Sequence, residues 1–152
     1  FKLIDFGRAV YKYKGRTICS DSYHHKGDAA TQYNFGPYFN PKKPRLEPNM
    51  SFDLCRLACS LYDHFDEYNH NNDKQWLKLI KLINKWCSDN DGKNLLYNNK
   101  GNERYPDFKL YRIISKNIHH CIPKYQLSHE IFKKFIYIDL NIPDNLIDID
   151  SL

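Results

Sequence analysis

The sequence predicts a mainly α-helical fold, and three features carry that prediction. Residues 51–65 are apolar nearly all the way round a helical wheel, which indicates a buried helix. Residues 73–87 place their apolar side chains on one helical face and lysines elsewhere. Residues 107–119 and 128–136 each begin with a residue that can cap a helix. Since no internal repeat is present, we expect these helices to share one core in a single domain.

The front of the chain predicts one short strand followed by a long loop. Residues 1–6 form an apolar run that Gly7 ends, as is typical of a β-strand. Residues 8–42 show little periodicity and are rich in Gly, Tyr, Lys, Ser and His. Loops of that length inside a compact domain are usually functional or disordered.

The predicted helix at 51–65 is the element around which the rest of the chain is expected to pack. Its apolar positions are Phe52, Leu54, Cys55, Leu57, Ala58, Cys59, Leu61, Tyr62 and Phe65. We expect Asp53 in its first turn to be buried and to need hydrogen-bond partners, because an unpaired buried charge is costly. The amides of the first turn supply only some of those partners. The pattern alone is equally that of a core helix in any α-rich domain.

The later helices are predicted from their spacing. The inward face of 73–87 consists of Trp76, Leu79, Ile80, Ile83, Trp86 and Cys87, and the lysines at 74, 78, 81 and 85 are expected in solvent. Residues 90–106 form a loop rich in Asn and Gly. Asp107 is expected to cap the third helix and Ser128 the fourth. In the fourth helix, Ile131, Phe132 and Phe135 are expected to point inward, and residues after 139 to be peripheral.

Composition limits the classes of partner and compartment. Lys and Arg total 23 against 18 Asp and Glu, a net charge of +5, and residues 139–152 hold four Asp and no base. This modest surplus suits acidic or phosphate-bearing partners, but no basic run marks a nucleic-acid-binding protein. No apolar stretch approaches the roughly 20 residues of a membrane span, and no signal peptide is recognised. The odd number of cysteines, five, predicts free thiols in a reducing compartment, either cytoplasm or nucleus.

The tripeptide Asp5-Phe6-Gly7 carries the chemistry. A carboxylate at the end of a buried strand can hold a divalent cation against phosphate oxygens, while the glycine lets the backbone reverse. A tripeptide alone is weak evidence for a metal site, so the residues that follow it matter. It is followed by a long segment, by Tyr38-Phe39-Asn40-Pro41-Lys42, and by a helix that reads S-F-D-L-C-R-L-A-C-S-L-Y from Ser51.

This order resembles the C-terminal lobe of eukaryotic-type protein kinases from the magnesium-binding strand onward. Pro123-Lys124-Tyr125-Gln126-Leu127-Ser128 is similar to the P-x-x-R-x-[ST] turn before the last helix of that family. The resemblance implies a partial kinase domain at 1–138 and an acidic tail at 139–152. It implies a mainly α fold with a short strand, a long activation segment and a buried central helix with further helices packed on it.

The resemblance also implies a function and its residues. The function is transfer of the γ-phosphate of ATP to a hydroxyl of a protein or peptide substrate, of the Ser/Thr type, with Mg²⁺. Asp5 would be the catalytic metal ligand, Phe6 a packing switch and Gly7 a hinge in the nucleotide site. Asp53 would support the catalytic loop, and its removal would cost on the order of 3–5 kcal/mol where it leaves the loop amides unpaired. Phosphorylation sites would lie among the hydroxyls of the activation segment, which are Thr17, Ser20, Ser22, Tyr23 and Thr31.

Several positions depart from the family pattern. Lys42 and Gln126 stand where the family has a Glu and an Arg that pair with each other, so both halves of that ion pair are replaced. Phe35 stands near the position of a substrate-contacting Thr, and Cys55 and Ala58 replace the usual Trp and Gly. These departures bear on peptide recognition more than on nucleotide binding.

The glycine-rich loop, the nucleotide-pairing Lys, its Glu partner, the H-R-D base and the second metal-binding Asn have no counterpart in the chain. In the family they precede the magnesium-binding strand, so the chain is expected to be part of a longer protein. Residues 1–152 alone are expected to be inactive, because one metal ligand cannot sustain phosphoryl transfer. Heavy use of Asn, Lys, Ile and Tyr suggests an A/T-rich source, such as a large DNA virus, whose host cytoplasm would be the compartment, or a protist.

Other interpretations remain open beside the kinase. The chain could be a catalytically dead kinase-like scaffold that binds a protein partner, or an unrelated small helical interaction protein. Zinc ligation by Cys19 with His24-His25, or by His119-His120-Cys121, is disfavoured because adjacent histidines point in different directions.

Aromatic residues interleaved with bases suggest a nucleic-acid platform, which is the last alternative. They are Tyr33, Phe35, Tyr38 and Phe39, with Lys42, Lys43 and Arg45. A substrate-binding loop packed on the core explains the same residues at less cost.

Overall fold

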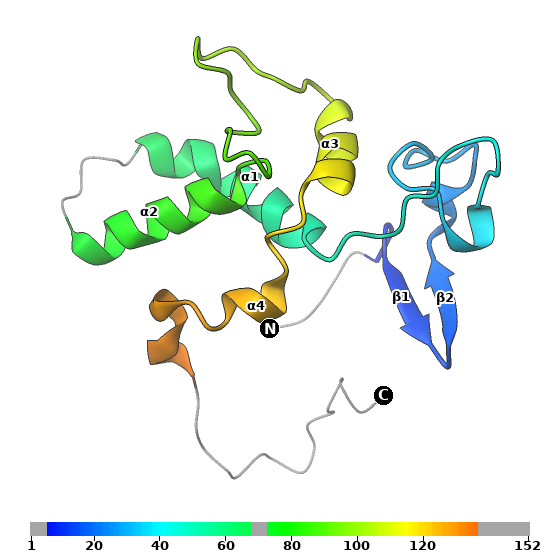
Figure 1. The fold of residues 1–152 in the computed structure, drawn as a ribbon, viewed down its shortest axis with the longest axis horizontal. Coiled ribbons are helices and arrows are strands. Elements are labelled where there is room, and N and C mark those ends of the chain that lie inside the picture. The colour runs from blue at the N-terminus through cyan, green and yellow to red at the C-terminus, as the bar shows by residue number, and fades with distance from the viewer. Residues whose placement is uncertain (1–5, 68–72, 137–152) are drawn as a thin grey trace.

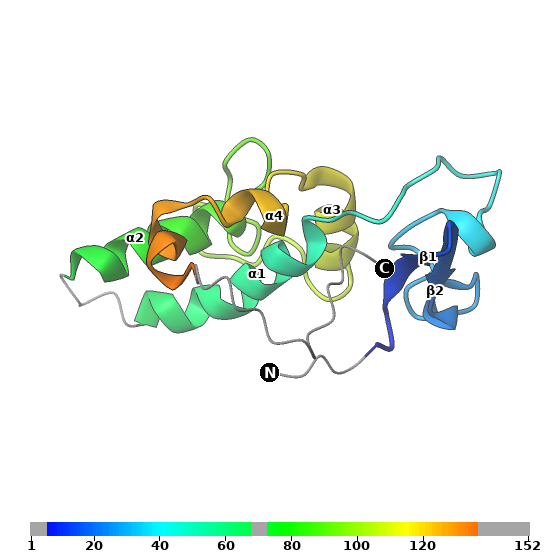
Figure 2. The ribbon, with the colours of Figure 1, turned by 90° about the horizontal axis from the view of Figure 1, so that it is seen from below.

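The computed structural model describes residues 6–67 and 73–136 and is mainly helical, as predicted. A hairpin of β1 (Val10–Tyr13) and β2 (Arg16–Cys19) is followed by two short 3₁₀ helices, η1 (Asp21–Tyr23) and η2 (Gly36–Tyr38). Then come α1 (Phe52–Glu67), α2 (Lys74–Trp86), α3 (Lys109–Asn117), α4 (Pro123–Gln126) and the 3₁₀ helix η3 (Glu130–Phe135). The hairpin lies to one side of the helices, the segment before α1 leads from it to the start of α1, and α2 runs beside α1 (Figures 1 and 2).

The hairpin corrects the prediction of a segment without strands between residues 8 and 42. Its strands pair antiparallel, with Val10 opposite Cys19 and Tyr13 opposite Arg16. Lys14 and Gly15 connect them with φ values of 47° and 73°, the left-handed conformation that a two-residue hairpin turn requires. The strands were missed because most of their side chains are exposed, so no apolar alternation marks them. The predicted strand at 1–6 lies outside the described residues except for Phe6.

Beyond the hairpin, the chain is held by a small core and by one asparagine. Buried Tyr23, Ala29 and Phe35 form what we call the N-terminal cluster, and Val10, Cys19, Tyr33 and Tyr38 pack against it. The Asn34 side-chain amide donates to the carbonyls of Asn40, Lys43 and Pro44 at 2.9–3.0 Å. This long segment is therefore ordered largely by side chains and not by regular structure.

Helix α1 confirms the predicted central helix but is not buried all round. Cys55, Ala58 and Cys59 are 0–3% exposed, and they face α2 and α3. Leu57, in contrast, is 53% exposed. The reason is that the described elements packed against α1 cover only one side of it.

Helix α2 agrees closely with its prediction. The Asp73 carboxylate accepts a hydrogen bond from the Gln75 amide at 2.9 Å and caps the N-terminus. Leu82, Ile83 and Trp86 are buried, and the four lysines are exposed as expected.

The last two predicted helices are partly wrong. Asp107 does not cap α3: it has a φ of 56°, and the N-cap residue is Phe108, which makes no side-chain cap hydrogen bond. The fourth helix is the 3₁₀ helix η3, capped by His129 instead of Ser128. Phe132 stacks on Trp86 with ring centroids 6.2 Å apart, but Phe135 is 71% exposed. Phe135 lies one 3₁₀ turn further on, past the contact with Trp86.

The main core lies among α1, α2 and α3. Its buried members are Cys55, Ala58, Cys59, Leu82, Ile83, Trp86, Cys87, Leu95, Leu110, Ile114, Ile118 and Cys121. Residues 90–106 form the predicted loop, which Asp89 organises by accepting from the Asp91 and Lys93 amides and from Arg104. Burial alone would raise the pKa of the Asp89 carboxyl, but the Lys93, Arg104 and Asp91 hydrogen bonds lower it below its usual value.

Asn49 joins the start of α1 to the end of α3. Its side-chain amide donates to the carbonyls of Ile114, Ser115 and Ile118, and its side-chain oxygen accepts from the Ser51 amide at 2.9 Å. The Ser51 hydroxyl in turn accepts from the Cys121 amide at 3.1 Å. The Ile114 carbonyl also accepts from the Ile118 amide, but carbonyls at a helix end generally have no partner within the helix, so Asn49 supplies a donor to Ser115 and Ile118.

We predict that Asn49→Ala lowers the free energy of unfolding by about 2 kcal/mol, because it leaves partly buried carbonyls unpaired. The measurement is urea denaturation followed by circular dichroism. Asn84→Ala, at an exposed position on α2, is the matched control and is expected to change the value by less than about 0.5 kcal/mol. Equal effects of the two changes would contradict the role given to Asn49.

Candidate functional site

The backbone that follows Asp5 is fixed by hydroxyl groups of the next segment. Asp5 itself lies outside the described residues, and Phe6 is 65% exposed at their edge. The Gly7 carbonyl accepts hydrogen bonds from the Ser20 hydroxyl at 2.5 Å and from the Ser22 hydroxyl at 3.4 Å. The end of the predicted metal-binding motif is thus attached to the start of η1.

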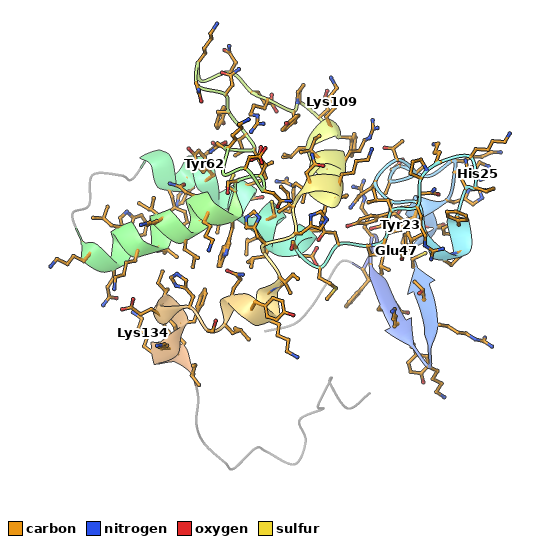
Figure 3. All side chains as sticks on the ribbon, in the orientation of Figure 1. Tyr23, His25, Glu47, Tyr62, Lys109 and Lys134 are labelled. Carbon is orange, nitrogen blue, oxygen red and sulfur yellow. The ribbon has the colours of Figure 1, made fainter. Side chains whose placement is uncertain are left out.

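Tyr23 adds a third hydroxyl to this network. Its hydroxyl donates to the Arg8 carbonyl at 2.8 Å, and the residue is only 7% exposed. Burial, reinforced by Tyr33, raises the pKa of Tyr23 to about 12, so the phenol is a neutral donor near pH 7. In Figure 3, Tyr23 lies on the side of the hairpin region nearer the helices, whereas His25 lies on the outer side.

Arg8 connects the same segment to the start of α3. Its guanidinium lies 5.7 Å from the ring centroids of both Phe108 and Tyr111. Arg56 of α1 lies over the same Tyr111 ring, with its guanidinium 5.1 Å from the ring centroid. Cation–π contacts of this kind are worth about 0.5–1 kcal/mol each at exposed sites, so they orient the segment more than they stabilise the fold.

The predicted phosphorylation sites differ in accessibility. Ser20 and Ser22 are half-buried and donate to Gly7, and Thr17 is half-buried in β2 with its methyl group near Gly36. Tyr23 is buried, and only Thr31 is exposed among these hydroxyl residues. Phosphate on Ser20 would place negative charge against the Gly7 carbonyl and break that hydrogen bond. Modification of any of them stays a prediction.

Asp53 is exposed, so the expectation that it is buried is wrong. It lies in the first turn of α1, where its charge helps to raise the pKa of Tyr23. The structure therefore places Asp53 on the same side as the Gly7–Tyr23 network. Its support of a catalytic loop stays a prediction, since residues 1–152 contain no such loop.

Gln126 makes neutral hydrogen bonds, whereas the family pattern has an Arg that forms an ion pair at this position. Its side-chain oxygen accepts from the Trp86 indole N–H at 2.9 Å, and its amide donates to the His120 carbonyl at 3.1 Å. Lys42 is exposed. Gln126 thus fastens the end of α2 to α4, a task that a neutral side chain can perform without a buried charge.

Most of the aromatic side chains before α1 pack against other side chains and are not fully exposed to solvent. Phe35 is 2% exposed and makes edge-to-face contacts with Tyr23 and Tyr33, with centroids 5.9 Å apart. Tyr33 in turn lies 6.3 Å from Phe52 of α1. Only Phe39 of the four is exposed, at 41%, and the Arg45 guanidinium lies over its ring. The rings join the N-terminal cluster to α1. A substrate-binding role for this segment stays a prediction.

Sequence reasoning missed a cluster of four thiols in the main core. Cys55, Cys59, Cys87 and Cys121 are each 0–3% exposed, and the Cys87 thiol donates to the Cys59 sulfur at 3.6 Å. All five cysteines of the chain are free. The spacing of four residues between Cys55 and Cys59 signals a shared helix face, but nothing in the sequence places Cys87 and Cys121 beside them.

No group of three or more His, Cys, Asp or Glu placed to hold a metal ion is found within the described ranges. The rings of His24 and His25 lie close together, with centroids 3.8 Å apart and their planes tilted by 47°. His120 instead lies within hydrogen-bond distance of the Lys85 carbonyl, at 2.9 Å, and of Asn90.

A groove of about 540 Å³ lies between α2 and η3. Its walls include Trp76, Leu79, Ile131 and Phe132, with Lys133 and Lys134 from η3. The Trp76 indole nitrogen is buried and has no hydrogen-bond partner within the part of the chain that is described. In the same residues, no helix combines the length and apolar character needed to cross a membrane.

Comparison with known proteins adds no relative: no family model, curated protein or solved structure matches the chain.

Proposed function

We propose that the chain is the C-terminal part of a protein kinase of the Ser/Thr type, with ATP as phosphate donor. The observation that carries this is the order of its parts. Asp5-Phe6-Gly7 comes first, a hydroxyl-rich segment follows, and α1 with Asp53 in its first turn comes next. The hydrogen bonds from Ser20 and Ser22 to Gly7 support the proposal, because they link the motif to the segment expected to regulate it.

The residues in hand supply only part of a nucleotide site. The Asp5 carboxylate would hold a Mg²⁺ ion, which when bound neutralises charge on the transferred phosphate. Asp5 is a single ligand, and no metal-binding group occurs in the described residues. Under this proposal, the general base and the second metal ligand would come from a preceding part of a longer protein. Residues 1–152 would contribute the activation segment and the helical support.

The test is phosphoryl transfer by the longer protein. We would extend the coding sequence upstream of the Phe1 codon, search it for an H-R-D-x-x-x-x-N-like run, and express the extended protein. The assay measures transfer of labelled γ-phosphate from ATP to a mixture of Ser/Thr peptides, with Mg²⁺ and with EDTA. We expect Mg²⁺-dependent transfer by the extended protein and none by residues 1–152 alone.

Absence of the run upstream would overturn the proposal of catalysis and favour the scaffold interpretation. Absence of both transfer and Mg²⁺-dependent ATP binding in a folded, extended protein that carries the run would do the same. An unrelated helical protein would instead show neither the run nor nucleotide binding.

A further inference from the structure

The four core thiols hold one close sulfur pair that joins two helices. Cys59 lies in the middle of α1, and Cys87 is the C-cap residue of α2. Their sulfur atoms are 3.6 Å apart, with the Cys87 thiol donating to Cys59. A disulfide bond is about 2.05 Å long, so the two sulfurs need to approach by about 1.5 Å to bond.

The surroundings of Cys59 favour a thiolate at this residue more than at the neighbouring cysteines. The neighbouring thiols of Cys55 and Cys87, of which Cys87 donates to Cys59 at 3.6 Å, stabilise the Cys59 thiolate, and the Arg56 guanidinium adds positive charge. These contacts outweigh burial and lower the pKa of the Cys59 thiol. The hydrogen bond to Cys59 and burial raise the pKa of Cys87. The Arg56 Nε is buried and forms no hydrogen bond that meets ordinary geometry with any described residue, so a nearby anion would be favourable for it.

We propose that Cys59 and Cys87 are a redox pair that a hydroperoxide converts into a disulfide linking α1 to the end of α2. Cys55 and Cys121 lie in the same core as this pair but are not expected to be oxidised with it. Cys19 takes no part because it packs against the N-terminal cluster. This inference does not depend on the proposed kinase function.

The reaction balances with one hydroperoxide. With hydrogen peroxide, the Cys59 sulfur attacks one oxygen and the O–O bond breaks. The departing hydroxide takes the proton of the Cys59 thiol to become water, and Cys59 becomes a sulfenic acid; an organic hydroperoxide would release its alcohol in place of this water. The Cys87 sulfur then attacks the Cys59 sulfur, the S–O bond breaks, and the second water leaves with the Cys87 proton. Two thiols lose two electrons, and the peroxide gains them.

The disulfide would restrict the connection between the two helices. It would close the chain from Cys59 to Cys87, a separation of 28 residues that includes all of α2. Because such a link limits the unfolded chain, the oxidised protein is expected to unfold at a higher urea concentration than the reduced protein.

The experiment is thiol mapping of the reduced 152-residue chain after treatment with hydrogen peroxide. Remaining thiols are alkylated, and the protein is digested with trypsin and examined by mass spectrometry. Each of the five cysteines falls on a different tryptic peptide, so every pairing has its own mass. We expect an intact mass lower by about 2 Da, loss of two alkylatable thiols, and a linked pair of the Cys59 and Cys87 peptides that dithiothreitol separates.

Three controls keep the result decisive. Cys19→Ser is expected to leave the linked pair unchanged, and Cys59→Ser to abolish it. Oxidation in urea is expected to spread the links over all five cysteines, because the pairing then loses its geometric cause. The proposal is overturned when the natively folded protein keeps five free thiols, or links Cys55 or Cys121 in preference. The natural chain decides this even where a serine variant does not fold.

Discussion

Replacing Asp5 with Asn in the extended protein is expected to lower Mg²⁺-dependent phosphoryl transfer at least about 100-fold, because a metal ion contributes several kcal/mol of transition-state charge stabilisation. Asn keeps the shape of the side chain but removes the charge that is proposed to hold the cation. The measurement is the initial rate of transfer at saturating ATP, with the Mg²⁺ concentration varied. A shift of the Mg²⁺ dependence to higher concentration would accompany the loss, since the ligand and not the fold is affected.

Asp28→Asn is the matched control for this change. Asp28 is exposed in the same hydroxyl-rich segment, so its replacement removes an equal charge without the predicted ligand. We expect its rate to stay within about twofold of the natural protein, as is usual for exposed positions. Similar rates for the two variants would remove Asp5 from the proposed metal site.

Replacing Ile83 with Ala is expected to cost about 3–4 kcal/mol of the free energy of unfolding, because it removes buried methyl groups and leaves a cavity. Ile83 is only 2% exposed and lies on α2 in the main core that α2 shares with α1. Since domains of this size have only about 5–15 kcal/mol of stability, the loss would be a large part of the total. Urea denaturation of the 152-residue chain measures it.

Leu77 offers a control on the same helix with a side chain of the same size. It is 46% exposed on α2. Leu77→Ala is expected to cost less than about 1 kcal/mol, since it loses little buried area. A cost for Ile83→Ala no greater than that for Leu77→Ala would contradict the packing of α2 on α1.

The helical part of the fold could be predicted because its signals are local. Helix α2 has a cap at Asp73, apolar residues at helical spacing and lysines on the other face, and each of these is a property of neighbouring residues. The hairpin could not be predicted in the same way, because its strands are mostly exposed and only Lys14-Gly15 marks the turn. Which aromatic residue of the last helix is packed also depends on a tertiary contact, because Phe132 and not Phe135 stacks on Trp86.

For the candidate site, too, the sequence predicted local features but not long-range contacts. The sequence determined by itself that the chain is mainly helical, that α1 and α2 exist, and that Asp5-Phe6-Gly7 precedes them; the kinase interpretation of this order stays a proposal. Only the tertiary structure decided that Asp53 is exposed, that Gln126 bonds to Trp86, and that Cys59 and Cys87 meet. Helix periodicity arises within a few residues, whereas burial and long-range contacts depend on which elements pack together, and a pattern of neighbours does not contain that information.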